Sequence, residues 1–287
     1  METFELRYFL AAAENESVIS AATKLSVSSP AISRAISRLQ EELGIQLFER
    51  KGRNIVLSAA GKDFQRKASR IIADLDDLKA QFKPTDYTPV SFIGTEFGLS
   101  AFLNGILGNL NRSGSKFSFE IKTSESSKAV ESSVLDGESR LGIISKVPSS
   151  RLASKRLGMI RSRVYIGKKH PLYPKAKRGE IPIGELLEYD FASFLSPSFL
   201  ESENALSPDG WRDDKFKRKV AFKSDSVPAL LSIVDAGGFI GYFPEHLAQG
   251  HELLHVNVSG CPYKCETSGY LIARDPNELS WMKWLFK

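Results

Sequence analysis

The histidines of His251–His255, in the stretch HELLH, have a spacing that could support metal chemistry. On a helix, this pattern places both imidazoles one turn apart, where they bind zinc while the glutamate acts as general base. Gly250 just before the stretch is a poor helix-interior residue and a good helix terminator, which argues against a helix and leaves a strand as the alternative. On a strand, the two histidines lie about 13 Å apart, too far to share one zinc ion. The sequence therefore favours an accidental match.

The only two cysteines, Cys261 and Cys265 in CPYKC, leave a weaker metal hypothesis open. One of the nearby histidines could join them around a metal, but C-x3-C lacks the usual spacing of a zinc tetrad. Two free thiols in a reducing compartment fit the sequence better. The stretch AGGFIG lacks the G-x-G-x-x-G spacing of a dinucleotide site. We expect no cofactor, no metal and no catalysis, with a zinc hydrolase as the contrasting hypothesis.

Composition indicates a globular protein of about two domains, with 287 residues of which 42% are hydrophobic and 25% charged. The net charge of +5 permits a nucleic-acid partner but does not require one. Glu2 and Glu5 stand where a signal peptide would carry basic residues, and no segment is as long and apolar as a membrane span. We expect a cytoplasmic protein with no membrane partner.

Basic residues concentrate between positions 24 and 70, where ten lysines and arginines face four acidic residues. Within this region we predict a helix over Val18–Leu25, a turn at Ser26–Ser28, and a second helix over Ser29–Leu43 that begins with serines and Pro30. A three-residue turn between two such helices is the arrangement of a helix-turn-helix.

The second helix has an apolar stripe of Ile32, Ile36, Leu39 and Leu43. The remaining face carries small hydroxyls and arginines, which suit base edges and phosphates in a major groove. An ordinary solvated face is the alternative for an isolated helix. The predicted DNA-contacting residues are Ser28, Ser29, Pro30, Ser33, Arg34 and Arg38, together with Arg50 and Arg53 at the tip of a predicted hairpin in IQLFERKGRNIVLS.

This region resembles the winged helix-turn-helix of the LysR-type transcriptional regulators. The resemblance is carried by AATKLSVSSPAISRAISRLQEELGIQLFER, then the basic hairpin and LSAAG. The sequence departs from the family at Ser29, Ala35 and Asn54, which the resemblance places among base-reading positions. These departures leave DNA binding intact but leave the operator sequence open.

A helix predicted from Ser58 to Phe82 carries apolar residues at heptad spacing: Phe64, Ala68, Ile71, Leu75, Leu78 and Phe82. This spacing predicts pairing with a second copy, and packing against its own domain is the alternative. The resemblance favours a dimer, because the family has its linker helix here. Two copies would present two recognition helices to successive major grooves.

Strands and helices alternate after the polar joint at Lys83–Pro89: strand Val90–Ile93, helix Leu99–Asn111, strand Phe117–Thr123, helix Ser127–Leu135 and strand Leu141–Ile144. The alternation indicates a mainly parallel α/β sheet with ligands at the carboxyl ends of its strands. The resemblance implies a two-lobed effector domain similar to periplasmic binding proteins. The expected domains are 1–57 (winged helix-turn-helix), 58–83 (linker helix), 84–89 (hinge), 90–161 with 268–287 (first lobe), and 162–267 (second lobe).

By resemblance, a small-molecule effector binds where the lobes meet. The expected residues there are Thr95, Glu96, Phe97, Ser145, Phe194, Ser224, Asp225, Ser226 and Tyr242. Glu96 stands where many family members have a small hydroxyl residue, and Arg140 where the family usually has Asp. A carboxylate opposes an anionic ligand, so we expect a neutral or cationic effector. An outward-facing glutamate at the helix start, or an empty cleft, is the alternative.

We therefore expect a sequence-specific, DNA-binding transcriptional regulator of LysR type. The resemblance implies double-stranded DNA and a small-molecule effector as partners, a homodimer or homotetramer, and RNA polymerase as a further partner. A pure small-molecule binding module with a vestigial DNA domain is the remaining alternative, and a gel shift separates it from a regulator. The sequence does not identify the effector, the target genes, or activation versus repression.

Overall fold

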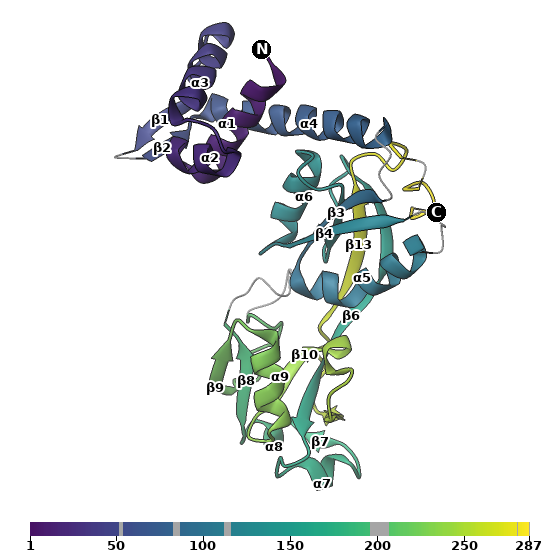
Figure 1. Ribbon diagram of the computed structural model, residues 1–287. Helices are drawn as coiled ribbons and strands as arrows, with labels where there is room; N and C mark the ends of the chain where they lie inside the picture. The colour runs from purple at the N-terminus through teal and green to yellow at the C-terminus, as the bar shows by residue number, and fades with distance from the viewer. Residues whose placement is uncertain (52–53, 83–86, 112–115, 196–206, 280, 287) are drawn as a thin grey trace. The chain divides into compact units, whose positions relative to one another are not determined.

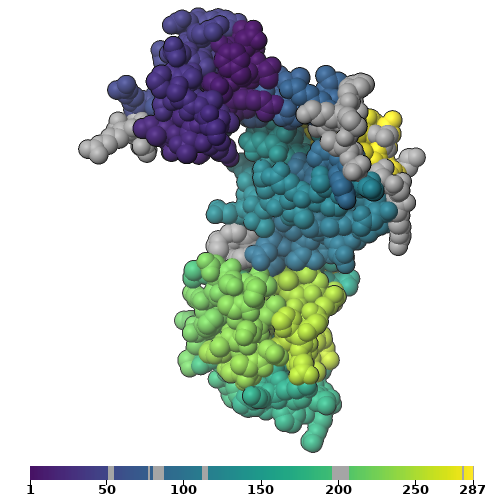
Figure 2. Space-filling view, viewed as in Figure 1, coloured from purple at the N-terminus to yellow at the C-terminus, as the bar shows by residue number. Residues whose placement is uncertain are grey.

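The computed structural model describes residues 1–51, 54–82, 87–111, 116–195, 207–279 and 281–286. The chain divides into two compact units, Met1–Thr88 with Leu135–Ser139, and Pro89–Val134 with Arg140–Lys287. Figures 1 and 2 colour the chain by residue number, with the start in purple and the end in yellow. No helix in the described part of the chain is both long enough and apolar enough to cross a bilayer.

The first unit is a winged helix-turn-helix followed by a long helix (Figure 1). Its elements are α1 Thr3–Asn15, α2 Val18–Leu25, α3 Ser29–Leu43, β1 Phe48–Lys51, β2 Asn54–Leu57 and α4 Ala59–Phe82. The antiparallel pairing of β1 and β2 confirms the predicted hairpin, and the bounds of α2 and α3 agree with those predicted. Helix α1 was not predicted, although Glu2 and Glu5 form a capping box at its start.

Local signals set the ends of α2 and α3. The Ser17 side chain accepts a hydrogen bond from the backbone N–H of Ser20 at 3.3 Å, which caps α2. Helix α3 has Pro30 in its first turn. It ends at Gly44, whose φ of 66° is a left-handed conformation that favours glycine. The three-residue turn between the helices therefore follows from the sequence itself.

The core of the first unit lies between α1, α3 and the first turns of α4. Phe9 packs against Phe48 and Phe64, with ring centroids 5.4 Å and 5.0 Å apart. Helix α3 buries Ile32, Ala35, Ile36 and Leu39. The prediction that the buried stripe continues to Leu43 is wrong, because that side chain is 38% exposed at the helix end.

The apolar residues of α4 do not form one continuous seam. Phe64 and Ala68 pack into the core of their own unit, together with Ile72. Ile71 and Leu78 are 49% and 53% exposed. The alternative of packing within the domain therefore holds for the first half of the helix, while the second half leaves apolar side chains uncovered in the single chain.

The second unit is an α/β domain. Its strands are β3 Thr88–Gly94, β4 Phe117–Thr123, β5 Leu141–Ile144, β6 Ala153–Gly167, β7 Ile181–Pro182, β8 Asp190–Phe194, β9 Lys219–Ser224, β10 Ile240–Pro244, β11 Leu253–Val256, β12 Val258–Ser259 and β13 Glu266–Ala273. Its helices are α5 Glu96–Asn111, α6 Ser127–Leu135, α7 Tyr173–Ala176, α8 Ile183–Leu186, α9 Val227–Asp235 and the 3₁₀ helix η2 Glu245–Ala248.

Two crossing strands join the two lobes of this unit. The main sheet has the order β4-β3-β5-β13-β6-β10-β8-β9, with β11 also paired to β6. Strand pairs β3/β5, β8/β9 and β8/β10 are parallel, as expected. Strands β6 and β13 run antiparallel to their neighbours, so the sheet is mixed where the lobes meet. The first half of β6 pairs with β13 and the second half with β10 and β11.

Each lobe has its own core. In the first lobe, α5 covers β3, β4 and β5, with residues near the C-terminus such as Met282 packed in. In the second lobe, the sheet has one apolar cluster on each face. Neighbouring side chains of β10 point to opposite faces of the sheet, so Tyr242 belongs to one apolar cluster and Phe243 to the other.

Candidate functional site

The outer face of α3 is polar and exposed. Ser28, Pro30, Ser33 and Arg34 are all exposed, and Ser29 is half-buried. The Ser28 side chain occupies the N-cap position but makes no capping hydrogen bond. A small hydroxyl at the start of an exposed helix, next to an arginine one turn on, can reach base edges and phosphates.

The two arginines of this face differ in their contacts. Arg34 donates a hydrogen bond from Nε to the carbonyl of Pro30 at 3.3 Å and has no ion pair within the described part of the chain. Arg38 lies 3.3 Å from the carboxylate of Glu5, which is almost completely buried in α1. Arg34 is therefore available to an external phosphate or base, whereas Arg38 also neutralises a buried carboxylate of its own unit.

Ala35 does not belong to the exposed face. Its side chain is buried between α3 and the rest of the unit, so the expectation that it is a base-reading position is wrong. Helical periodicity explains the difference, because Ala35 lies three residues after Ile32 on the buried stripe. The base-reading roles expected of Ser29 and Asn54 stay predictions.

The hairpin supplies a second cationic position. Arg50 is exposed on β1, opposite Ile55 of β2. Gly52 and Arg53, at the tip, lie outside the described residues, so the predicted role of Arg53 stays a prediction. The sequence nonetheless places several positive charges in this short hairpin, as DNA-backbone contacts require.

The HELLH stretch is not helical. Strand β11 begins at Leu253 and includes His255, while His251 precedes it in a bend, so the expected strand is confirmed. The described residues contain no cluster of His, Cys, Asp and Glu that could hold a metal ion. Burial lowers the pKa of the His255 imidazole, and the nearby charge of Arg163 lowers it further.

Thr95 and Glu96 start α5 at the carboxyl end of β3. Thr95 is buried and its hydroxyl accepts a hydrogen bond from the backbone N–H of Gly98 at 3.3 Å, so it caps the helix. Glu96 is exposed in the first turn, where a carboxylate suits the helix dipole. Partial burial raises the pKa of this carboxyl group. The position fits both the effector hypothesis and the outward-facing alternative.

The structure brings Phe97, Phe194 and Ser224 together. Phe97 of α5 and Phe194 of β8 are fully buried, with ring centroids 5.1 Å apart in an edge-to-face pair. Phe194 is the cross-strand partner of Ser224. Ser226 caps α9 by accepting a hydrogen bond from Ala229, and Asp225 beside it is exposed. The aromatic pair therefore belongs to the core that joins α5 to the second lobe.

Ser145 and Arg140 lie on the first lobe. Ser145 follows β5, is buried, and its Oγ has no hydrogen-bond partner among the described groups. Arg140 lies 3.4 Å from the carboxylate of Glu278. The positive charge that Arg140 brings to the first lobe is therefore paired with a negative charge of the same lobe. Ser145 keeps an unused hydroxyl, a feature expected of a ligand-binding position.

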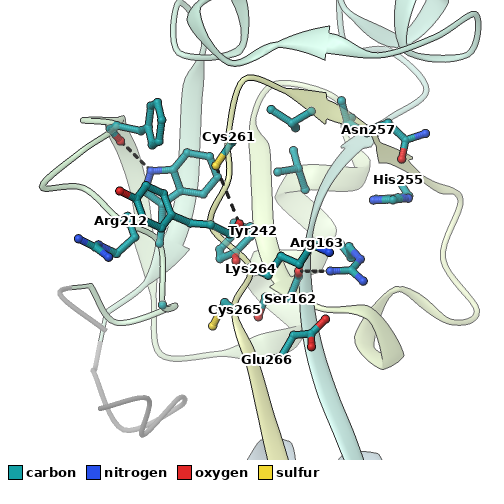
Figure 3. Close-up of a pocket in the computed structure, with 17 residues that line it drawn as sticks. Ser162, Arg163, Arg212, Tyr242, His255, Asn257, Cys261, Lys264, Cys265 and Glu266 are labelled. Carbon is teal, nitrogen blue, oxygen red and sulfur yellow. Dashed lines mark hydrogen bonds between the residues drawn. The ribbon is translucent and has the colours of Figure 1, made fainter. Parts of the chain in front are cut away.

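Tyr242 lies apart from this group, in the wall of a cavity of about 590 Å³ in the second lobe (Figure 3). The cavity is bounded by β6, β10, β11, the segment around Trp211 and the chain leading into β13. Its lining residues are Ser162, Arg163, Val164, Gly210, Trp211, Arg212, Phe216, Tyr242, His255, Val256, Asn257, Val258, Cys261, Tyr263, Lys264, Cys265 and Glu266. The aromatic pair of Phe97 and Phe194 lies on the opposite sheet face.

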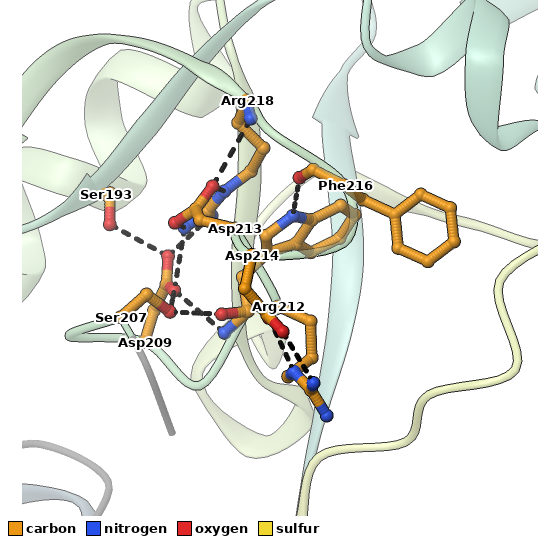
Figure 4. Close-up of polar contacts among 9 residues, drawn as sticks. Ser193, Ser207, Asp209, Arg212, Asp213, Asp214, Phe216 and Arg218 are labelled. Atoms are coloured by element: carbon orange, nitrogen blue, oxygen red, sulfur yellow. Dashed lines mark hydrogen bonds and ion pairs between the residues drawn. The ribbon is translucent and has the colours of Figure 1, made fainter. Parts of the chain in front are cut away.

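A buried ion-pair network supports one wall of this cavity (Figure 4). Arg218 donates to both carboxylate oxygens of Asp209, at 2.7 Å and 3.0 Å, and to Asp213 at 2.9 Å. Burial alone lowers the pKa of the Arg218 guanidinium, but its bonds to Asp213 and Asp209 outweigh this effect and raise it. Asp209 also accepts from the backbone N–H of Trp211 at 3.1 Å, which fixes the aromatic wall.

Sequence reasoning missed most of the cavity. Of its lining residues, only Tyr242 was assigned to a small-molecule site, and it was grouped with residues of the other sheet face. Alternation along β10 could have separated Tyr242 from Phe243, because neighbouring strand residues point to opposite faces. No sequence signal links Arg163 of β6 to Trp211 or Lys264, which are distant along the chain.

Two family models match the chain. Residues 4–62 match the model described as "Bacterial regulatory helix-turn-helix protein, lysR family", and residues 93–280 match "LysR substrate binding domain". The first match covers α1 to the start of α4, and the second covers the α/β unit up to its last turns.

Relatives and solved structures agree with these matches. The uncharacterized HTH-type transcriptional regulator YybE of Bacillus subtilis is 28% identical over 258 residues, which cover 85% of this chain and 83% of that protein. The HTH-type transcriptional regulator BenM of Acinetobacter baylyi is 40% identical over 83 residues, 29% of this chain and 27% of that protein. The crystal structure of full-length CbnR complexed with the target DNA has a TM-score of 0.67 at 19% identity and covers 100% of this chain and 97% of that one.

Proposed function

This chain belongs to the LysR family of bacterial transcriptional regulators, and on that premise we propose that it reads its operator with the exposed face of α3. The observation that carries the proposal is Arg34, an exposed arginine with no ion pair in the described part of the chain, beside the uncommitted hydroxyl of Ser28. The DNA in the CbnR complex supports double-stranded DNA as the partner. Arg38 and the hairpin residue Arg50 would add backbone contacts.

A dimer is the proposed reading unit. The exposed side chains of Ile71 and Leu78, with the half-buried Leu75 between them, leave an apolar strip on α4 that a second copy can cover. Two copies would place two α3 helices in successive major grooves. Pairing of dimers into tetramers and contact with RNA polymerase belong to the same proposal, as does action in the cytoplasm.

The small-molecule effector is proposed to act at the carboxyl ends of β3, β5 and β9. Thr95, Ser145 and the Ser224–Ser226 turn end these strands, and ligands of open α/β sheets bind at such ends. Ser145 supports the site because its buried hydroxyl has no partner among the described groups. The exposed carboxylate of Glu96 disfavours an anion there, so the proposed effector is neutral or cationic.

DNA binding is tested with one variant and a matched control. A fragment flanking the gene that shifts with wild-type protein is labelled, and binding is followed by fluorescence anisotropy across a salt series. Arg34→Ala should weaken binding by about 1–3 kcal/mol, because it removes a groove contact. Arg178→Ala removes the same charge from an exposed position in the second lobe and should leave binding unchanged. Equal affinities for the two variants would reject α3 as the reading surface.

A further inference from the structure

The cavity of the second lobe has aromatic walls. Trp211 and Tyr242 are nearly buried, and their rings meet edge to face with centroids 5.0 Å apart. Phe216 and Tyr263 form a second edge-to-face pair at 6.0 Å. Aromatic faces of this kind bind flat apolar groups. The volume of about 590 Å³ lies inside the range typical of small-molecule pockets.

The charged groups of the lining are unequally neutralised. Arg212 is bound by both oxygens of Asp214, each at 2.7 Å, so its charge is matched within the same segment. Glu266 lies 3.3 Å from Arg161, so the carboxylate of the lining is also matched. Neither Arg212 nor Glu266 therefore determines the charge that the cavity presents to a ligand.

Arg163 and Lys264 form no ion pair in the described part of the chain, although Glu245 and Arg163 both influence the pKa of His255. Arg163 is half-buried, and its one side-chain hydrogen bond goes to the carbonyl of Ser162 at 3.3 Å. Lys264, labelled in Figure 3, is an exposed residue of the lining. Across the residues that the structure describes, neither cation lies within ion-pair distance of a carboxylate. Burial lowers the pKa of the nearby His255 imidazole, which favours its neutral form, so it adds no further positive charge to the lining.

Ser162 and Cys265 also line the cavity, Ser162 buried and Cys265 half-buried. The Ser162 Oγ interacts with the Cys265 thiol, a contact that by itself lowers the pKa of that thiol. Burial has the larger effect and raises the pKa of the Cys265 thiol, so this thiol stays protonated and is a poor nucleophile. The wall therefore fits reversible binding better than thiol chemistry.

We propose that this cavity binds a small planar organic anion, with its flat part against the aromatic walls and its charge toward Arg163 and Lys264. The site goes beyond the effector region proposed above, because its aromatic walls belong to the apolar cluster of Trp211 and Tyr242 and not to that of Phe97 and Phe194. It also has the opposite charge preference from the Glu96 region. The buried network of Arg218 and Asp209 holds the aromatic wall in place for such a ligand.

The test uses full-length protein without DNA and three flat probes that differ in charge. Isothermal titration calorimetry compares 2-naphthoate with its neutral analogue 2-naphthamide and the cation 2-naphthylmethylammonium. Wild-type protein should bind 2-naphthoate at least about tenfold more tightly than either analogue, because hydrogen bonds to charged groups are the strongest available in the site. The variants Arg163→Gln and Lys264→Gln should each weaken 2-naphthoate binding and leave 2-naphthamide binding unchanged.

Arg156→Gln is the matched control, because it removes an exposed arginine from the same strand, outside the cavity. A loss of 2-naphthoate affinity in either cavity variant beyond that of the control supports the proposal. Equal binding of 2-naphthoate and 2-naphthamide, no binding of 2-naphthoate at about 1 mM, or cavity variants that behave as the control overturn it. The calorimetry contains no DNA, so a negative result in it does not bear on the Arg34→Ala experiment. A negative result in the Arg34→Ala experiment likewise does not bear on the calorimetry.

Discussion

Removal of the Asp209 carboxylate should destabilise the second lobe strongly. The Asp209 side chain is fully buried, and that of Arg218 is 1% exposed. Besides two bonds from Arg218, Asp209 accepts hydrogen bonds from Ser193 Oγ at 2.8 Å, Ser207 Oγ at 2.9 Å and the backbone N–H of Trp211 at 3.1 Å. Asp209→Ala therefore leaves a buried guanidinium with one remaining carboxylate, and it removes the acceptor of Ser193 Oγ and of the Trp211 N–H.

The magnitude follows from the loss of one partner of a buried ion pair, which costs about 3–5 kcal/mol. With a urea slope of about 2 kcal/mol per molar, the unfolding midpoint should fall by about 1.5–2.5 M. Asp214→Ala is the control in the same segment. Its partner Arg212 remains in contact with water, so the midpoint should move far less.

The assay follows the emission of Trp211 during urea unfolding, in a background with Trp281→Phe and Trp284→Phe. Trp211 reports the correct region, because its indole N–H donates to the carbonyl of Phe216 at 2.7 Å. The double variant Asp209→Ala with Arg218→Met should recover much of the lost stability, since no unpaired charge remains. If Asp209→Ala unfolds at the same urea concentration as Asp214→Ala, the reasoning about the buried pair is refuted.

Four further results are expected. Leu75→Lys should lower the mass measured by light scattering, because a charge on the apolar strip of α4 opposes pairing; an unchanged mass would reject pairing through this strip. Glu96→Gln should weaken a cationic effector and strengthen an anionic one in thermal shift over amines and carboxylates, and identical shifts would reject its role. Burial lowers the pKa of His246, so stability should fall as pH drops below about 6.5, and His246→Gln should flatten this dependence in urea unfolding at several pH values. Gly61→Ala should destabilise the first unit in thermal unfolding, because a Cβ there would lie 2.0 Å from the carbonyl oxygen of Leu47; an unchanged melting temperature would contradict that contact.

Residues that act locally made the DNA-binding unit readable from the sequence. Ser17, Pro30 and Gly44 set the ends of α2 and α3 through capping and a left-handed turn, and the spacing of Ile32, Ile36 and Leu39 defined the face opposite the candidate DNA surface. Signals of this kind depend only on residues within one helical turn, so they can be recognised in the sequence before the fold is known. Helix α1 carried a similar signal in its capping box, which was overlooked.

Tertiary packing decided the rest. Whether Ile71 or Ile72 of α4 is buried depends on how the helix lies against α1 and α3, because adjacent residues on a helix differ by about 100° and both fit an apolar pattern. The cavity depends on contacts between β6, the Trp211 segment and the chain before β13, which are far apart in the sequence. The sequence by itself determined the family, the helix-turn-helix with its hairpin, the alternation of strands and helices between positions 90 and 144, and the exposed face of α3. The tertiary structure decided which residues surround Arg163, Arg218 and Tyr242. Contacts between residues that are far apart in the sequence produce no periodic pattern from which they could be predicted.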